Sequence, residues 1–167
     1  KAFPSWSALS AAQRSKHLMA ISNRIEERLD ELAAAESRDN GKPYKLAQAV
    51  DIPRARDNFS FFATAILHQE EEFHNMGAKG FNYTLRQPLG PVACISPWNL
   101  PLYLFSWKIA PALAAGNCVV AKPSEVTPYT AYLLSQICIE VGFPAGVLNI
   151  VHGLGAEAGQ ALVENDT

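Results

Sequence analysis

Short apolar segments alternate with segments of helical length from residue 91 onward, and this alternation restricts the fold more than any other feature of the sequence. The apolar segments cover residues 92–95, 118–121 and 147–151. Two segments of helical length, residues 100–115 and 127–141, lie between them, and each ends at a glycine. This order predicts parallel strands joined by crossover helices, and the wholly apolar strands predict a sheet that is covered on both faces. A further helix is expected over residues 155–164.

The amino-terminal region is expected to be helical. Ser10 and Gln13 have the spacing of a capping box, which opens a helix. An apolar stripe then recurs at steps of three and four residues, and it consists of Leu18, Ile21, Ile25, Leu29 and Leu32. The Asn-Gly pair at residues 40–41 is a typical helix end. A second helix is expected after Pro43 or Pro53 and runs to Ile66.

Between this helix and the first apolar strand, the chain has the signals of a surface segment. An acidic run at residues 70–72 and a glycine-containing stretch at residues 77–80 indicate a solvated turn. Residues 81–86 alternate in polarity like a strand, and residues 88–91 form a turn.

Composition indicates a globular α/β chain of one domain or slightly more. Of the 167 residues, 49% are apolar and 18% are charged, which is typical of a packed core and argues against disorder. The net charge of −2 gives no reason to expect a nucleic-acid partner or an acidic membrane surface. No apolar run is long enough to cross a bilayer, so we expect no membrane partner. The sequence begins with Lys1, and we expect it to be part of a longer protein.

The three cysteines do not form a recognisable site. Cys94, Cys118 and Cys138 are widely spaced and lie in apolar segments, with no Cys-x-x-Cys pair. We interpret them as reduced, buried thiols of a cytoplasmic protein, and we expect no bound metal.

Three loops follow the predicted strands, at residues 96–99, 122–125 and 152–155. In an open parallel sheet, ligands bind at the carboxyl ends of the strands, so we expect the functional residues of this chain to lie in these loops. The three strands amount to about one mononucleotide-binding half of a doubly wound sheet.

Each loop has a functional and a plain interpretation. Lys122 and Glu125 suit the hydroxyls of a ribose, and the carboxylate would disfavour a 2′-phosphate; the alternative is a surface loop with a helix-start glutamate. Gly153, Gly155 and Gly159 have a lengthened dinucleotide spacing; the alternative is a turn followed by a packing glycine. Asn99, after Pro97-Trp98, could donate to a developing oxyanion; the alternative is an asparagine that caps the next helix.

Taken together, these loops resemble the aldehyde dehydrogenase superfamily. The matching stretches are residues 86–101, 107–117, 120–125 and 142–151, followed by the glycine loop, with Arg14, Glu36 and residues 41–43 upstream. The resemblance covers essentially the whole chain. It implies an α/β fold with amino-terminal helices over residues 1–72, a β segment for oligomerisation over residues 73–90, and half of a doubly wound, Rossmann-like NAD-binding sheet over residues 91–167.

The resemblance also implies roles for individual residues. Asn99 resembles the asparagine whose side-chain amide stabilises the tetrahedral thiohemiacetal. Lys122 and Glu125 resemble the pair that holds the adenosine ribose of NAD. The remaining matched cofactor positions are Ser96 and Trp98, whose backbone lines the site, and Gly155 and Gly159, near the pyrophosphate.

The chemistry of this superfamily also needs a cysteine nucleophile and a general-base glutamate, and neither motif occurs in this sequence. The first hypothesis is therefore an enzyme that oxidises a small aldehyde with NAD in the complete protein. The second is a truncated, non-catalytic chain that at most binds nucleotide or other subunits. A third, a separate Rossmann-type binding module, leaves the Pro97-Trp98-Asn99 loop and the helical amino-terminal region without an explanation.

Substrate preference is indicated by positions that line the aldehyde tunnel in the superfamily, namely Arg54, Leu100, Tyr103, Leu104 and Trp107. A guanidinium among apolar side chains would suit a substrate with a distal carboxylate. Members that act on 2-aminomuconic or 2-hydroxymuconic semialdehyde share this Arg54 motif and the Pro-Trp-Asn-Leu-Pro loop. The alternative is that Arg54 is a surface residue beside Arg56. The β segment implies a homo-oligomer, either a dimer or a tetramer.

Overall fold

A three-stranded parallel sheet organises the chain, which a computed structural model describes from residue 1 to residue 165. Its strands are β3 (Pro91–Ile95), β4 (Cys118–Lys122) and β5 (Leu148–Ile150), paired in the order β3-β4-β5. Helices α6 (Pro101–Ala114) and α7 (Tyr129–Glu140) connect successive strands. The strands, crossover helices and parallel pairing expected from the sequence are therefore confirmed.

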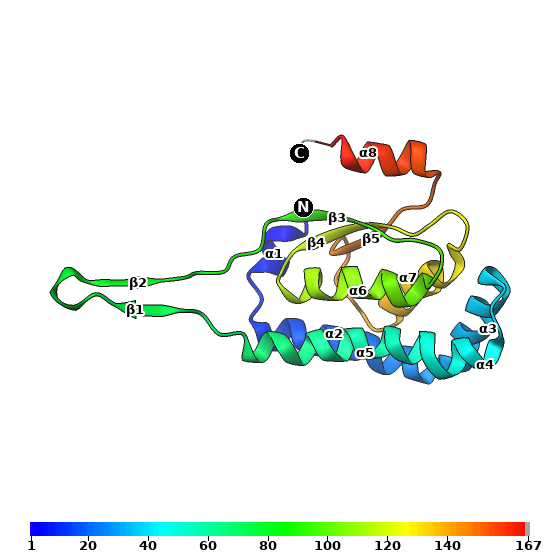
Figure 1. Cartoon of the computed structure of the whole chain (residues 1–167), viewed down its shortest axis with the longest axis horizontal. Coiled ribbons are helices and arrows are strands. Elements are labelled where there is room, and N and C mark those ends of the chain that lie inside the picture. Colours follow the sequence, from blue (N-terminus) through cyan, green and yellow to red (C-terminus); the bar gives the residue numbers. More distant parts are fainter. Residues whose placement is uncertain (166–167) are drawn as a thin grey trace.

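Two layers of helices lie beneath one face of this sheet (Figure 1). Helices α6 and α7 pack against the strands, and helices α2 (Ala11–Glu27) and α5 (Ile52–Ala65) pack beneath them. The centre of this packing contains side chains that solvent does not reach, including Phe59, Ile109 and Val119. Burial of such side chains stabilises the fold by roughly 1.5–3 kcal/mol each.

The opposite face of the sheet is only partly covered, which limits the prediction of cover on both sides. Among the described helices, α8 (Gln160–Val163) lies above the strands on this side in Figure 1. Leu162 of α8 lies with Val120 along a cavity of about 200 Å³, while Ala93 and Asn149 on the same face are exposed. One helix of four residues is too short to cover three strands.

The amino-terminal helices follow the sequence signals with one difference. The capping box is formed, since Ser10 Oγ accepts from the N–H of Gln13 at 3.3 Å and Gln13 Oε1 accepts from the N–H of Ser10 at 2.9 Å. The apolar stripe, however, belongs to two helices, because the chain breaks at Arg28 between α2 and α3 (Leu29–Asn40). Arg28 pairs locally with Glu31 and also with Glu140 of α7, and the second ion pair is a tertiary contact that a local pattern does not show.

The remaining amino-terminal elements are short. They are α1 (Phe3–Ser7), α4 (Tyr44–Leu46), a π-helical turn (Ala47–Asp51) and a 3₁₀ turn (Ile66–His68). Gly41 ends α3 with φ of 81°, the left-handed conformation expected of a glycine after a helix. Within residues 1–165, no helix is long and apolar enough to cross a membrane.

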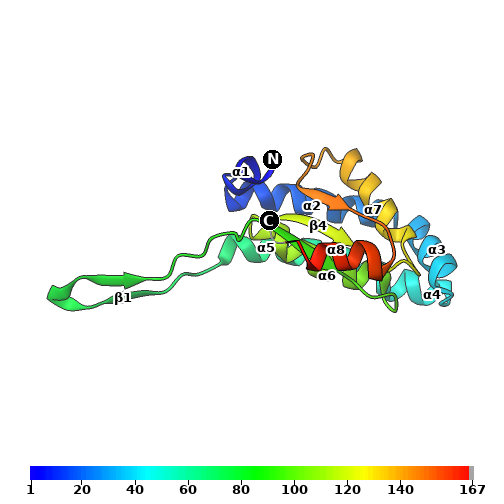
Figure 2. The ribbon, with the colours of Figure 1, turned by 90° about the horizontal axis from the view of Figure 1, so that it is seen from above.

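A hairpin arm projects from the body of the molecule (Figure 2). Strands β1 (Phe73–Asn75) and β2 (Phe81–Tyr83) pair antiparallel around a 3₁₀ turn (Gly77–Lys79). The strand expected over residues 81–86 is therefore present but shorter. The rings of Phe73 and Phe81 stack at 5.6 Å, yet both side chains are more than 60% exposed. The arm thus displays aromatic surface that the body of this chain does not cover.

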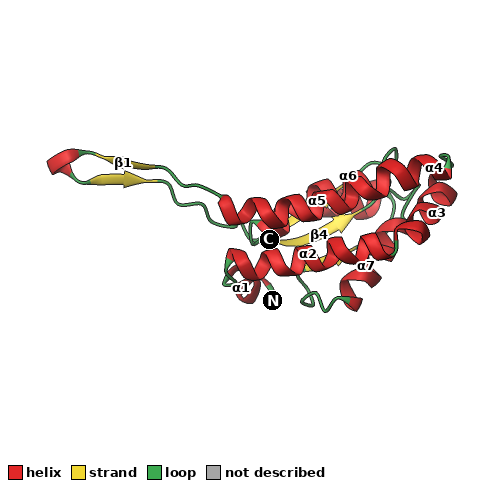
Figure 3. Cartoon of the chain, turned by 90° about the horizontal axis from the view of Figure 1, so that it is seen from below, coloured by secondary structure: helices red, strands yellow, loops and turns green. Residues whose placement is uncertain are grey.

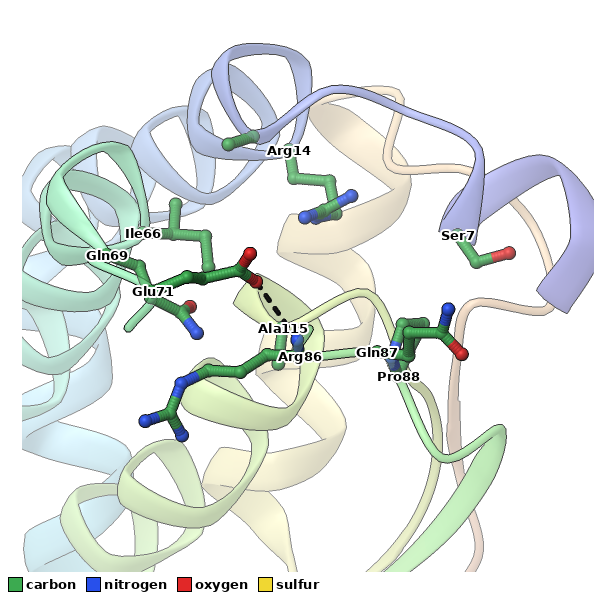
Figure 4. A pocket seen from close by; sticks show the side chains of 10 residues that line it. Ser7, Arg14, Ile66, Gln69, Glu71, Arg86, Gln87, Pro88 and Ala115 are labelled. Carbon is green, nitrogen blue, oxygen red and sulfur yellow. Dashed lines mark hydrogen bonds between the residues drawn. The ribbon is translucent and has the colours of Figure 1, made fainter. Parts of the chain in front are cut away.

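The arm leaves the body beside a cavity of about 330 Å³ (Figure 4). Glu71 and Arg86 join the two sides of the arm here, because the backbone N–H of Arg86 donates to Glu71 Oε1 at 2.9 Å. Arg14 donates from Nε to the carbonyl of Ala114 at 2.9 Å and also to the carbonyl of Leu9. Since α6 ends at Ala114, this cavity lies toward the amino ends of the strands, away from the three predicted loops.

Candidate active site

Lys122 and Glu125 form the centre of the candidate site. Lys122 is the last residue of β4, and its side chain is only 2% exposed. Its ammonium donates to Glu125 Oε2 and to the carbonyl of Pro123, both at 3.0 Å. Buried ammonium groups are rare unless they are paired. Lys122 is therefore an internal, paired charge at the strand end.

The carboxylate of Glu125 connects two of the predicted loops. Its Oε1 accepts from the backbone N–H of Gly155 at 3.2 Å, while Oε2 faces Lys122. The backbone N–H of Glu125 itself, the Lys122 ammonium and the N–H of Gly155 lower the pKa of this carboxyl to about 2. Glu125 is consequently ionised at neutral pH and remains partly accessible to a ligand.

The glycine loop packs closely over this pair. Residues Gly155–Gly159 form a π-helical turn that leads into α8. A Cβ atom added to Gly159 would lie 3.7 Å from Cδ of Lys122, which is ordinary van der Waals contact. The two glycines predicted to approach a pyrophosphate thus lie against the Lys122–Glu125 pair. Gly159 packs on the Lys122 side chain, and the backbone N–H of Gly155 donates to Glu125.

The loop after β3 lies beside the loop after β4. The backbone N–H of Ser96 donates to the carbonyl of Lys122 at 3.1 Å, which extends the strand pairing by one residue. The carbonyl of Trp98 accepts from Thr127 Oγ1 at 3.4 Å. The Ser96 hydroxyl is buried and has no hydrogen-bond partner within residues 1–165. The predicted cofactor positions of these two loops therefore share one edge of the sheet.

Asn99 does not cap the helix that follows it. The N-cap residue of α6 is Leu100, and no side chain caps this helix end. Asn99 is exposed, and within the described part of the chain its amide makes no hydrogen bond. The capping interpretation is thus wrong, and the amide is left available to a ligand.

A buried charged cluster, which sequence reasoning did not assign to the site, adjoins Asn99. The Lys42 ammonium lies 2.5 Å from Asp51 Oδ2 and 3.8 Å from Glu36 Oε1, and the three side chains are 8%, 2% and 0% exposed, respectively. The same ammonium lies 3.5 Å from the carbonyl of Asn99. The sequence signal that could have indicated its burial is the position of Glu36, four residues after Leu32 and therefore on the apolar stripe.

The positions predicted to face the substrate lie on α6 and on the adjacent part of α5. Leu100 at the start of α6 is followed by Tyr103, Leu104 and Trp107 at helical spacing, and the rings of Tyr103 and Trp107 contact each other at 5.6 Å. Asn58 Nδ2 donates to the carbonyl of Tyr103 at 3.1 Å, which joins α5 to α6.

Arg54 lies one helical turn before Asn58 in α5, and it is exposed. It makes no ion pair or hydrogen bond within residues 1–165, whereas Arg56 pairs with Glu26 and Asp57. Arg54 is therefore an exposed guanidinium without a partner among the described residues, on the helix that packs against α6.

The cysteines have the properties of structural thiols. All three are free; Cys118 and Cys138 are buried and Cys94 is half-buried. Burial raises the pKa of each thiol, and that of Cys138 reaches about 12. None is therefore a thiolate at neutral pH. Over the part of the chain that the structure describes, no group of three or more metal-binding side chains is present.

Comparisons with known proteins agree with this arrangement. The model of the aldehyde dehydrogenase family matches residues 1–167. The 2-aminomuconic semialdehyde dehydrogenase of Danio rerio is 54% identical over 166 residues, which is 99% of this chain and 34% of that protein. The 2-hydroxymuconic semialdehyde dehydrogenase of Pseudomonas sp. strain CF600 is 45% identical, covering 96% of this chain and 34% of that protein. The chain thus spans about a third of the length of these curated relatives.

Solved structures show the same fold. PnpE from Pseudomonas sp. WBC-3 has a TM-score of 0.94 at 46% identity, covering 98% of this chain and 34% of that one, and a structure in complex with nicotinamide adenine dinucleotide matches equally well. The NAD⁺ complex of an aldehyde dehydrogenase from Bacillus cereus has a TM-score of 0.95 at 38% identity, covering 99% of this chain and 34% of that one.

The buried Glu36 predicts a pH dependence of stability. Burial is the main reason that its pKa rises from 4.5 to about 7; the charge of Asp51 raises it further and Lys42 opposes this. At low pH, Glu36 is protonated in both the folded and the unfolded chain. As pH rises from 4.5 to about 7, the unfolded chain releases a proton that the folded chain retains. The Glu36 contribution to the free energy of unfolding therefore falls by about 3 kcal/mol across this window.

Glu36→Gln should remove this dependence. Urea unfolding of the variant and of the unsubstituted chain at several pH values measures it, and the variant should lose less stability as pH rises. Glu70→Gln, which changes an exposed carboxylate, serves as the control and should follow the unsubstituted chain. Parallel curves for all three proteins would show that Glu36 is not a proton-binding group of the folded state in this range.

Proposed function

The chain belongs to the aldehyde dehydrogenase family, and on this premise we propose that it forms the cofactor-binding and oxyanion-binding part of an enzyme that oxidises an aldehyde to a carboxylic acid with NAD. The observation that carries the proposal is that two loops leave one edge of the sheet: the loop of Asn99, whose amide has no partner within residues 1–165, and the loop of Lys122 and Glu125. A free amide donor and a carboxylate suited to sugar hydroxyls, carried on neighbouring loops, suit the reaction of a carbonyl with a bound nucleotide.

NAD is the cofactor, and the residues at the sheet edge fit it. In this proposal, the ionised carboxylate of Glu125 accepts from the ribose hydroxyls, and the buried Lys122 fixes the carboxylate and donates to the same sugar. The turn of Gly155 and Gly159 approaches the pyrophosphate, and the backbone of Ser96 and Trp98 lines the remaining wall. NAD supplies the hydride acceptor, while these residues hold its adenosine part.

Asn99 has a separate role in the proposed mechanism. Nucleophilic attack on an aldehyde moves negative charge onto the carbonyl oxygen, and the unpartnered amide of Asn99 donates a hydrogen bond to that oxygen. The thiolate nucleophile and the general-base glutamate of the family have no counterpart motif among these 167 residues, and the raised pKa values of Cys94, Cys118 and Cys138 exclude them as substitutes at neutral pH.

We infer that the substrate is a semialdehyde with a distal carboxylate. The similar proteins act, by name, on 2-aminomuconic and 2-hydroxymuconic semialdehydes. Arg54 supports this inference, because its exposed guanidinium has no partner within residues 1–165 and it lies on α5, the helix that packs against α6. Bidentate pairing with a carboxylate is the contact that such a group favours.

We also propose that residues 73–90 mediate pairing with a second copy of the chain. The exposed aromatic side chains of the arm, Phe73, Phe81 and Tyr83, support this assignment. The alternative function, a non-catalytic chain that binds nucleotide or other subunits, would retain the arm and the Lys122–Glu125 pair but would give Asn99 no catalytic role.

The first test concerns the cofactor. In a full-length protein that carries this sequence, Glu125→Gln removes the carboxylate that accepts from the ribose, so KM for NAD should rise roughly ten- to hundredfold. KM for NADP should rise less, because the charge that repels the 2′-phosphate is also lost. Steady-state kinetics with both nucleotides measures the change, with Glu70→Gln as the control. An unaltered KM for NAD would remove Glu125 from the cofactor site.

The second test concerns the oxyanion. In the same full-length protein, Asn99→Ala should lower kcat by roughly 10²–10³ with little change in KM for NAD, as expected for loss of a donor to the transition state. Exchange of a nearby exposed residue, Val126→Ala, should leave kcat within a factor of about two. A variant that turns over at the original rate would favour the non-catalytic alternative for this loop.

The third test concerns the substrate. Arg54→Met should lower kcat/KM by roughly tenfold or more for aldehydes that carry a distal carboxylate, and much less for neutral aldehydes of the same length. Arg56→Met is the matched control, because that guanidinium already pairs with Glu26 and Asp57. Equal losses for acidic and neutral aldehydes would exclude Arg54 as the carboxylate anchor.

A further inference from the structure

The turn that ends α3 lies against the backbone of the oxyanion loop. Asn40 Nδ2 donates to the carbonyl of Trp98 at 2.9 Å, and two residues later the Lys42 ammonium lies 3.5 Å from the carbonyl of Asn99. Gly41, with φ of 81°, supplies the sharp turn between them. Two successive carbonyls of the oxyanion loop are therefore contacted by two side chains from one turn.

This turn is itself held in place. The carbonyl of Lys42 accepts from Ser37 Oγ at 2.7 Å, and the ammonium is anchored by Asp51 at 2.5 Å and Glu36 at 3.8 Å. All three charged groups are buried. Burial of an ion cluster is a poor way to gain stability, because desolvation offsets much of the attraction. A buried cluster does, however, hold an ammonium in one place.

The carbonyl of Trp98 is also contacted by a second segment of the chain. Thr127 Oγ1, in the loop after β4, donates to it at 3.4 Å. The oxyanion loop is thus held between the end of α3 and the cofactor loop. By contrast, the amide of Asn99 has no partner within residues 1–165, so no side-chain contact sets its direction. Its direction depends on the backbone that carries it.

We propose that Asn40 and Lys42 are positioning residues that hold the Trp98–Asn99 backbone and thereby direct the Asn99 amide toward the carbonyl oxygen of the substrate. This proposal rests on the proposed oxyanion function of Asn99. In this proposal both residues act through the Trp98 and Asn99 carbonyls that they contact. A donor that is already in place when charge develops lowers the barrier more than one that must reorient.

A double-mutant cycle in a full-length protein that carries this sequence tests the proposal. Asn40→Asp keeps the size of the side chain but replaces the donor with a carboxylate that repels the Trp98 carbonyl. It should lower kcat roughly tenfold with KM for NAD little changed. In the Asn99→Ala background, the same substitution should change kcat by less than about twofold, because no amide remains to be directed.

A second variant and a control complete the design. Lys42→Met, which removes the other contact, should show the same non-additivity with Asn99→Ala. If Lys42→Met fails to fold because Glu36 and Asp51 lose their buried cation, the Asn40→Asp variant still tests the proposal, since Asn40 is only half-buried. Arg38→Gln alters an exposed neighbour in α3 that makes no ion pair within residues 1–165, and it should leave kcat unchanged in both backgrounds.

Three results would overturn the proposal. An unchanged kcat for Asn40→Asp would show that the contact directs nothing, and equal losses in both backgrounds would show a general structural role. An unchanged kcat for Asn99→Ala alone would remove the oxyanion function of Asn99, and the positioning proposal with it. Amide hydrogen exchange at residues 98–100 distinguishes failure of the positioning proposal from failure of the oxyanion function. Faster exchange in Asn40→Asp would show that the backbone contact exists even if it does not serve catalysis.

Discussion

Parallel pairing of β3 with β4 is the constraint on which the candidate site depends. The register places Ile95 opposite Lys122, so both strands end at the same edge of the sheet. The N–H of Ser96 continues the pairing by donating to the Lys122 carbonyl at 3.1 Å. Two loops that are separated by a whole helix in the sequence are thereby brought side by side. A shift of this register would separate the loop of Asn99 from the Lys122–Glu125 pair.

Some polar groups of the candidate site have partners within the protein, and others have none among the described residues. Lys122 and Glu125 are paired with each other, and the backbone N–H of Gly155 donates to the second oxygen of the carboxylate. These contacts hold this part of the site in place before any ligand binds. The side-chain amide of Asn99 and the guanidinium of Arg54 have no partner among the described residues. Rigid groups suit the recognition of a cofactor, whereas unpartnered donors are available to a substrate whose charge changes during the reaction.

The two edges of the sheet differ in what they support. At the amino edge, Arg14 joins α2 to the end of α6, and the Glu71–Arg86 contact holds the base of the arm (Figure 4). Figure 3 shows the arm extending from this end of the body. At the carboxyl edge lie the loops of the candidate site. The arm extends from the amino edge, at the other end of the strands from those loops. Chemistry and the proposed subunit contact are thus separated along the strand direction.

The sequence by itself determined the features that depend on local patterns: the strand and helix order, the capping box at Ser10 and the three loops at strand ends. It also predicted the Lys122–Glu125 pair. The break at Arg28, the burial of Glu36 beside the oxyanion loop and the free amide of Asn99 were decided only by the tertiary structure. Each of these depends on which distant segments pack nearby, such as Glu140 beside Arg28 at the helix break. Local propensity carries no information about such partners, because only the packed fold brings them within reach.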